Sequence, residues 1–322
     1  VSPIIKPVMV NVPRRKKPIS NRKKEVQRAL FLPDVHAGFR KDFRSGKMVP
    51  FHDRRALQVA LQIAKEETFD YVIWLGDLLD SAEWSDRFLR SPEFYWTTQP
   101  AICELAWWLG LFVQAQPGAE HVAIEGNHDV RPENSIIRHL KQAYDLRPAR
   151  ELDAPHALSM DRLLHLQEIG IKWINGYADE KADYHVGSHF AATHGHLARK
   201  NPGSTAYEMT KRWDQNVVYG HVHKREKVTR TVYREGHDEL ITAMSPGLLG
   251  RVDYVIPGHH KGQHWQQGAG TAEFRDGSDP DLHIVPISQG RAMYRGTLFT
   301  AEEENEIIEE LDAGTDWKFE RD

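Results

Sequence analysis

The chain has 322 residues, of which 40% are hydrophobic and 27% are charged, and its formal net charge is −4 at pH 7. This length is enough for one large domain or two small ones, with a sizeable buried core. No run of about 18 apolar residues predicts a membrane-spanning helix, and the single cysteine, Cys103, excludes an internal disulfide framework. We therefore expect a cytoplasmic protein with no membrane partner, and the composition leaves its oligomeric state open.

Charge is distributed unevenly between the two ends of the chain. Residues 6–28 contain nine basic residues and one acidic residue, whereas residues 301–322 contain ten acidic and two basic residues. A basic arm of this kind can bind the phosphate backbone of a nucleic acid nonspecifically, and the alternative is a solvated tail that only aids solubility. In the acidic tail, Ile307, Ile308 and Leu311 can share one helical face, which predicts a short amphipathic helix.

Strands and helices alternate in the first half of the chain. Apolar runs predict buried strands at residues 28–32, 71–75 and 121–124. Periodic apolar residues predict helices at about residues 53–67, with Asp53 as the N-cap, and 101–114. This alternation favours an α/β fold with parallel strands, in which functional residues gather at the carboxyl ends of the strands.

The second half of the chain contains more strands. Apolar or alternating runs predict strands at residues 184–186, 190–193, 217–219, 227–234, 284–287 and 293–299. Helical segments are expected before them, near residues 135–144 and 158–168. Residues 258–277 are rich in glycine and have little periodicity, so we expect a long loop there.

Five short polar segments each follow an apolar, strand-like run. They are residues 34–36 (Asp-Val-His), 76–80 (Gly-Asp-Leu-Leu-Asp), 126–129 (Gly-Asn-His-Asp), 193–196 (Thr-His-Gly-His) and 220–223 (Gly-His-Val-His). Alternation at a strand end lets Asp34 and His36 point the same way, and neighbouring glycines permit close backbone approach. Each segment alone is a weak signal, but their conjunction at strand ends predicts one site. Carboxylates combined with imidazoles suit Mn, Fe, Zn, Co or Ni better than calcium.

The order of these segments resembles the calcineurin-like metallophosphoesterase superfamily. The pattern of that superfamily is D-x-H, G-D-x-x-D, G-N-H-D/E, a single H and G-H-x-H, and every element is intact between about residues 30 and 223. The resemblance implies an α/β fold, a four-layer α/β/β/α sandwich of two mixed β-sheets flanked by helices. We place this catalytic domain at residues 28–300, between a basic arm and an acidic tail, with inserts at about residues 81–118 and 130–183.

The resemblance also implies a centre with two divalent transition-metal ions. The ligands that it implies for one ion are Asp34, His36, Asp77 and His223. Asp77 would bridge to a second ion, whose other implied ligands are Asn127, His194 and His221. Manganese is the expected metal, with iron, zinc, cobalt, nickel or magnesium as alternatives.

The resemblance assigns further roles around the implied metals. His128 would lie near the leaving-group oxygen, Asp129 would orient His128, and Asp80 would support the turn that carries the bridging ligand. His194 and His196 are both candidates for the ligand in the fourth segment. We prefer His194, because it directly follows a predicted strand, and His196 would then face substrate, support a ligand or simply pack.

Residues beside the segments are candidates for substrate contacts. Phe39 and Arg40 lie just beyond the first segment, and Arg131 lies just beyond the third. Aromatic residues are frequent between positions 81 and 108, and aromatic side chains near a phosphoesterase cleft can stack on nucleobases. The interpretation that we favour for this aromatic segment is a core layer or an oligomer interface.

These observations predict hydrolysis of a phosphoester substrate by a hydroxide that two metal ions activate. The basic arm and the aromatic segment favour a phosphodiesterase acting on nucleic acid or nucleotides. The alternatives are a phosphomonoesterase, acting on protein or on small molecules, and a non-catalytic scaffold that keeps the fold for binding. The sequence has no G-x-x-x-x-G-K-[ST] phosphate loop and no H-E-x-x-H metalloprotease motif.

Overall fold

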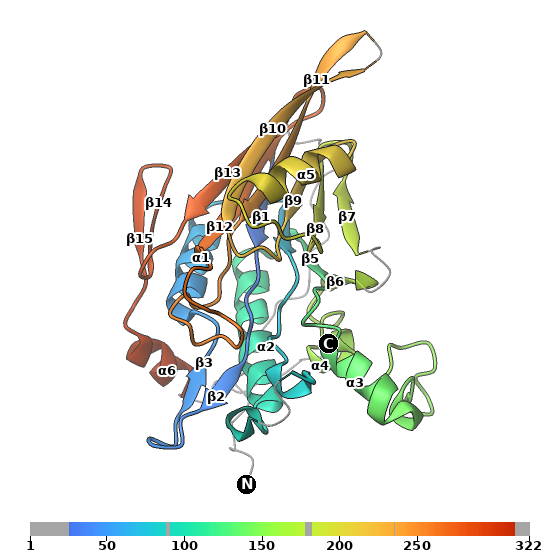
Figure 1. Ribbon diagram of the computed structural model, residues 1–322, viewed down its shortest axis with the longest axis vertical. Helices are drawn as coiled ribbons and strands as arrows, with labels where there is room; N and C mark the ends of the chain where they lie inside the picture. Colours follow the sequence, from blue (N-terminus) through green and yellow to red (C-terminus); the bar gives the residue numbers. More distant parts are fainter. Residues whose placement is uncertain (1–25, 88–90, 178–181, 235, 313–322) are drawn as a thin grey trace.

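Two facing β-sheets form the centre of the computed structural model, which describes residues 26–87, 91–177, 182–234 and 236–312 (Figure 1). The predicted basic arm lies outside these residues except for its last two positions, and so does the end of the acidic tail. Among the described residues, no helix is long and apolar enough to cross a membrane.

The first sheet has six strands. In spatial order they are β13 (Asp281–Pro286), β12 (Gly268–Phe274), β1 (Gln27–Leu32), β4 (Tyr71–Trp74), β5 (Glu120–Ile124) and β6 (Ile171–Ile174). The last four strands run parallel, whereas β12 pairs antiparallel with both of its neighbours. Parallel strands need crossover connections, and two long helices, α1 (Arg54–Glu66) and α2 (Thr98–Ala115), lie in the connections from β1 to β4 and from β4 to β5.

The second sheet has five strands. In spatial order they are β10 (Arg225–Arg234), β11 (His237–Pro246), β9 (Asn216–Tyr219), β8 (Phe190–Thr193) and β7 (Asp183–Val186). The strands β8, β9 and β11 run parallel, and the two edge strands pair antiparallel with them. The hairpin of β10 and β11 extends beyond the body of the molecule, and α5 (Ser204–Arg212) lies over this sheet (Figure 1).

Shorter elements surround the two sheets. Two hairpins pair β2 (Phe39–Lys41) with β3 (Met48–Pro50) and β14 (Arg291–Tyr294) with β15 (Thr297–Thr300). The remaining α-helices are α3 (Arg131–His139), α4 (Met160–Leu163) and α6 (Glu304–Asp312). Short 3₁₀ turns are η1 (Ala82–Trp84), η2 (Pro92–Phe94) and η3 (Lys141–Ala143).

The buried side chains confirm a four-layer α/β/β/α arrangement. Successive residues of a strand point to opposite faces, and in β1 Leu30 and Leu32 pack into the cluster formed with α1 and α2. Phe31, on the other face, packs against Phe190 of the second sheet, with ring centroids 5.4 Å apart. Beyond the second sheet, Met209 of α5 packs on the outer face of β9. The layers therefore stack in the order helices, first sheet, second sheet, helix.

The prediction of a loop at residues 258–277 is wrong for the second half of that segment, where β12 lies between β1 and β13. Its glycines mark close packing rather than a loop. A Cβ at Gly270 would meet the Phe31 side chain at 3.3 Å, and a Cβ at Gly268 would overlap a backbone carbonyl of β11. The strand predicted at residues 293–299 is a hairpin, and residues 158–168 are helical only at α4.

The aromatic segment after position 80 belongs mainly to the core. Phe94, Trp107 and Trp108 are buried, as the favoured interpretation expects, whereas Tyr95 and Trp96 are 38% and 57% exposed.

The predicted N-cap of helix α1 is confirmed, because the Asp53 carboxylate accepts hydrogen bonds from Arg55 N and Ala56 N in the first turn.

Candidate metal centre

Loops at the carboxyl ends of strands from both sheets converge on one buried cluster. Asp34 follows β1, Asp77 follows β4, and the last of the five segments follows β9. Ligand atoms of four buried residues lie within 4.8 Å of one another, and these residues are Asp34, His36, Asp77 and His223. Their distances include 3.0 Å between His36 Nε2 and His223 Nε2 and 3.3 Å between His223 Nε2 and Asp34 Oδ1.

A second group of ligand atoms adjoins the first. Asn127 Oδ1 lies 3.0 Å from His194 Nε2 and 2.8 Å from His221 Nδ1. His194 Nε2 lies 3.4 Å from Asp77 Oδ2, the carboxylate that also belongs to the first group. The structure therefore brings together all seven residues of the predicted ligand set, with Asp77 between the two groups.

The backbone at this cluster is held in a conformation that L-amino acids rarely adopt. Five members of the cluster have positive φ angles, and they are Asp34 (42°), His36 (50°), Asp77 (49°), His221 (69°) and His223 (55°). A residue in such a sparsely populated region costs on the order of 1–3 kcal/mol, and these residues cluster at functional sites. Hydrogen bonds between the loops hold the conformation, including His36 N to Asp77 O at 2.9 Å and His221 N to Asp34 Oδ1 at 2.9 Å.

Two glycines make the close approach of the loops feasible. A Cβ at Gly220 would lie 2.7 Å from Asp34 Oδ2 and 2.9 Å from the Leu75 carbonyl oxygen. A Cβ at Gly126 would overlap the backbone nitrogen of Asp77. At both positions the Cβ of a larger residue would clash with one of the clustered carboxylates.

Burial sets the protonation of the clustered side chains. It lowers the pKa of His221 to about 4 and that of His223 to about 3, so both imidazoles are neutral at pH 7 and keep a lone pair. Burial also raises the pKa of Asp34 to about 6. Buried carboxylates beside neutral imidazoles are stabilised by a bound cation, and this mixture of oxygen and nitrogen donors fits a divalent transition metal.

The five segments also belong to a recognised sequence family. The family model described as calcineurin-like phosphoesterase matches residues 28–265. The chain belongs to the calcineurin-like phosphoesterase family. It is therefore a metal-dependent phosphoesterase, and the buried His/Asp cluster has the ligand atoms to hold divalent metal ions.

Relatives of this phosphoesterase occur in bacteriophages. The chain is 25% identical to the Gene 54 protein of Mycobacterium phage D29 over 264 residues, which cover 79% of this chain and 96% of the relative. It is 24% identical to the Gene 54 protein of Mycobacterium phage L5, with the same coverage. Similar solved structures include the phosphoesterase Yfce from E. coli (14% identity, 86% of this chain and 100% of that one, TM-score 0.35). Another is the purple acid phosphatase PPD1 from yellow lupin (13% identity, 91% and 56% coverage, TM-score 0.41).

His128 lies beside the metal cluster of the phosphoesterase. Its Nδ1 is 2.8 Å from the Asp80 carbonyl oxygen, and Arg131 Nη2 is 2.9 Å from its Nε2. Burial opposes protonation, but the carboxylates of Asp77 and Asp80 outweigh burial and raise the pKa of His128. A guanidinium can only donate hydrogen bonds, so the contact with Arg131 requires that His128 Nε2 carry no proton. Protonation of Nε2 would therefore break the contact.

Asp129 does not orient His128, which corrects the role expected from the resemblance. Its carboxylate accepts hydrogen bonds from Gly126 N, Leu78 N and Leu79 N, at 2.9, 3.2 and 3.0 Å. Those donors belong to the loops that carry Asn127 and Asp77. Asp129 therefore joins the two loops, and the contacts to His128 come instead from Asp80 and Arg131.

The Asp80 carboxylate contacts two histidines at the site, His36 and His128. Its Oδ2 lies 3.1 Å from His36 Nδ1 and 3.3 Å from His128 Nδ1. A carboxylate beside the far nitrogen of an imidazole fixes the ring orientation and leaves the other nitrogen for a metal. Asp80 thus connects the first ligand group with His128.

The structure separates the two candidate histidines of the fourth segment. His194 is fully buried in the cluster. His196 is exposed, with its Nε2 3.4 Å from Arg212 Nη1.

The predicted substrate contact is wrong for Phe39, because its side chain is 2% exposed and packs on His52 in the core. Arg40, its neighbour in β2, is exposed.

Sequence reasoning missed two aromatic residues next to the cluster. The ring of Trp265 meets the edge of His223 with centroids 4.2 Å apart and stacks on His259 at 3.9 Å. Tyr177 contacts His194 at 5.6 Å. Neither lies near a motif, and Trp265 falls in the segment predicted as a loop, so no sequence signal identified them.

Proposed function

We propose that this phosphoesterase hydrolyses phosphodiester bonds in nucleic acid or nucleotides with the help of two divalent metal ions. The observation that carries the two-ion proposal is the position of Asp77, whose carboxylate lies between two groups of nitrogen and oxygen donors. Bound at these groups, two ions would neutralise the phosphoryl oxygens and lower the pKa of the attacking water. Manganese is our proposed metal.

We assign the ligands by the groups in which they lie. Asp34, His36 and His223 would hold one ion, and Asn127, His194 and His221 would hold the other. Asp77 would bridge the two ions. The strained, hydrogen-bonded loops hold these donors in place before a metal or substrate arrives, which reduces the reorganisation needed on binding.

His128 is our proposed general acid. It borders the cluster, and Asp77 and Asp80 favour its protonated form. As the bond from phosphorus to the leaving oxygen breaks, His128 would transfer a proton to that oxygen. Arg131, displaced from the protonated ring, would then be free to donate hydrogen bonds to a phosphoryl oxygen.

An exposed aromatic and basic surface supports a nucleic-acid or nucleotide substrate. Trp96 and Tyr95 are exposed in the segment that follows Asp80, and Lys41 Nζ lies 4.7 Å from the centre of the Trp96 ring. Arg40 lies next to Lys41 on β2. Exposed rings between cations are typical of surfaces on which bases stack while phosphates are neutralised.

The test compares two model esters. Protein stripped of metal and reloaded with Mn²⁺ is assayed on bis-p-nitrophenyl phosphate, a diester, and on p-nitrophenyl phosphate, a monoester, beside an Asp77→Asn variant. We expect metal-dependent turnover that is lost in the variant, with the diester preferred. A preference for the monoester would replace our proposal with a phosphomonoesterase. An intact metal centre with no turnover on a broad panel of phosphoesters would favour a binding scaffold.

A further inference from the structure

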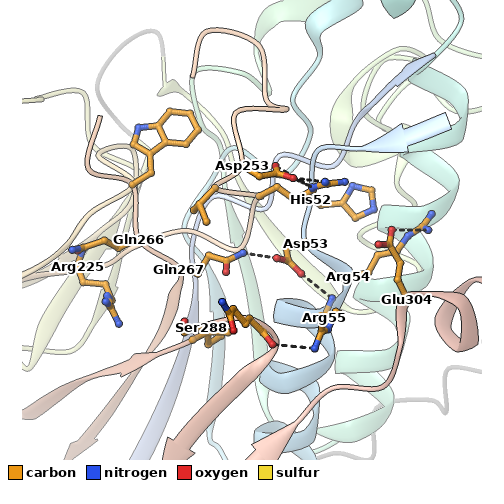
Figure 2. Close-up of a pocket in the computed structure, with 15 residues that line it drawn as sticks. His52, Asp53, Arg54, Arg55, Arg225, Asp253, Gln266, Gln267, Ser288 and Glu304 are labelled. Atoms are coloured by element: carbon orange, nitrogen blue, oxygen red, sulfur yellow. Dashed lines mark hydrogen bonds and ion pairs between the residues drawn. The ribbon is translucent and has the colours of Figure 1, made fainter. Parts of the chain in front are cut away.

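A second polar cavity lies beside the metal centre. It has a volume of about 520 Å³ and is lined by the start of α1, the start of β10 and the segments before β12 and after β13. Figure 2 shows Arg225 and Gln266 on one side of this cavity, Arg55 on the other, and Ser288 between them. The cavity is large enough for a group of nucleotide size.

Two contacts connect the cavity to the metal centre. Gln266, one of its lining residues, donates its backbone N–H to the carbonyl oxygen of His223 at 2.8 Å. Trp265, which also lines the cavity, meets the His223 ring with centroids 4.2 Å apart. The cavity and the cluster are therefore neighbours, because Gln266 and Trp265 of the cavity lining both contact His223 of the cluster.

The acidic groups of the cavity already have partners. Asp53 caps α1 with one oxygen, and its other oxygen accepts from Gln267 Nε2 at 2.7 Å. Asp253 pairs with Arg251, and Glu304 lies 3.8 Å from Arg54 (Figure 2). Asp253 and Glu304 therefore each face an arginine already, whereas the hydrogen bonds of Asp53 come from neutral N–H donors.

Two cations lining the cavity lack a carboxylate partner among the described residues. The Arg225 guanidinium has no hydrogen bond or ion pair there, because the contact of this residue to Gln266 uses its backbone nitrogen. Burial lowers the pKa of Arg225 without an opposing carboxylate. Arg55 donates only to the backbone oxygen of Gln289, at 3.0 Å, and its Nε is buried without a partner. Arg225 and Arg55 are therefore the lining guanidinium groups that no carboxylate pairs, and the lining as a whole has four arginines against three carboxylates.

We propose that this cavity binds a phosphate-bearing anion through Arg225 and Arg55. Guanidinium groups form paired, charge-assisted hydrogen bonds with phosphate oxygens, and the side chains of Ser288 and Gln266 supply further polar atoms. The anion is either a second phosphate group of the substrate, an assignment that rests on the proposed function, or free phosphate that binds independently of turnover.

The binding arm of the test uses pyrophosphate and the full chain stripped of metal, so that bound metal ions cannot hold the probe. Titration calorimetry compares the wild type with Arg225→Gln, Arg225→Lys and Arg251→Gln. The last variant is the matched control, because it removes the same charge from the same cavity but from a guanidinium that Asp253 already pairs. We expect Arg225→Gln to weaken binding about tenfold or more, which corresponds to about 1.4 kcal/mol. Arg225→Lys should recover part of the loss, and Arg251→Gln should change the affinity less than about twofold.

The kinetic arm distinguishes the two sources of the anion. The Mn²⁺-loaded enzymes are assayed on a thymidine dinucleotide with and without a 5′ phosphate. If Arg225→Gln raises KM only for the phosphorylated dinucleotide, the ligand is a second substrate phosphate. If pyrophosphate binding falls but both KM values stay unchanged, the ligand is a free anion. Pyrophosphate binding that is the same in the wild type and in Arg225→Gln would overturn the cavity proposal. Absence of turnover on either dinucleotide would count against the proposed function alone.

Discussion

Replacing Gly220 with alanine tests whether the metal centre depends on the close approach of its loops. The added Cβ would lie 2.7 Å from Asp34 Oδ2 and 2.9 Å from the Leu75 carbonyl oxygen, whereas ordinary contact begins at 3.4 Å. Either the carboxylate or the loop must therefore move by about 0.7 Å, the difference between 3.4 and 2.7 Å. A displacement of about 1 Å in an active site can lower the rate about 100-fold, so we expect kcat to fall roughly 20- to 30-fold.

Stability and metal content should change with the rate. Overpacking of a close-packed region costs about 1–3 kcal/mol, which should lower the melting temperature. The variant should also bind less metal after dialysis, because Asp34 is one of the proposed ligands. The assays are turnover of bis-p-nitrophenyl phosphate in saturating Mn²⁺, elemental analysis and thermal melting.

Gly118→Ala is the matched control for this experiment. It makes the same chemical change at a glycine where an added Cβ meets nothing within 4 Å. We expect wild-type kcat and metal content in the control. If Gly220→Ala also kept both, the clash would be relieved without moving Asp34, and the steric reasoning would be refuted.

Three further predictions concern side chains around the site and in the core. His128→Ala should lower kcat by about 100-fold or more while metal content stays intact, and loss of both metals would contradict the general-acid role. Asp129→Asn should lower metal affinity, because its NH2 group would replace one of the two oxygens that now accept hydrogen bonds from Gly126 N, Leu78 N and Leu79 N; unchanged affinity would mean that the contacts are dispensable. Glu104→Gln should destabilise the fold by about 3–5 kcal/mol at pH 7, because buried Glu104 pairs with Arg54 and His52. Burial opposes ionisation of Glu104, but these partners hold its pKa well below the usual range. The difference in the free energy of unfolding between wild type and variant, measured in urea, should therefore shrink as the pH falls below about 4.5. A difference that stays constant with pH would refute this.

The residues of the metal centre were predictable because each motif is local. Asp34 and His36 stand two positions apart after a strand, and the carboxyl ends of parallel strands meet at one edge of a sheet. Once β1 and β4 are recognised as parallel neighbours, Asp34 and Asp77 must lie close together. The family pattern then supplied Asn127, which has no distinguishing chemistry of its own.

The failures have a different physical origin, because they depend on contacts between distant segments. The glycines of β12 indicate a loop when only local propensity is considered, yet Gly270 lies against Phe31 from the opposite end of the chain. Asp129 follows His128 in sequence, but its carboxylate points to the Asp77 loop. The cavity around Arg225 has the same origin, since its walls come from residues as far apart as positions 52 and 304.

At the proposed metal ligands, the left-handed backbone makes selection for stability and selection for activity favour different residues. Glycine adopts positive φ readily, so a glycine at Asp34, His36 or Asp77 would relieve backbone strain while removing a proposed ligand. A search for variants by heat resistance alone would then favour changes at these positions and eliminate catalysis first. Thermostabilisation of this phosphoesterase should therefore keep the strained loops fixed and vary the helical layers instead.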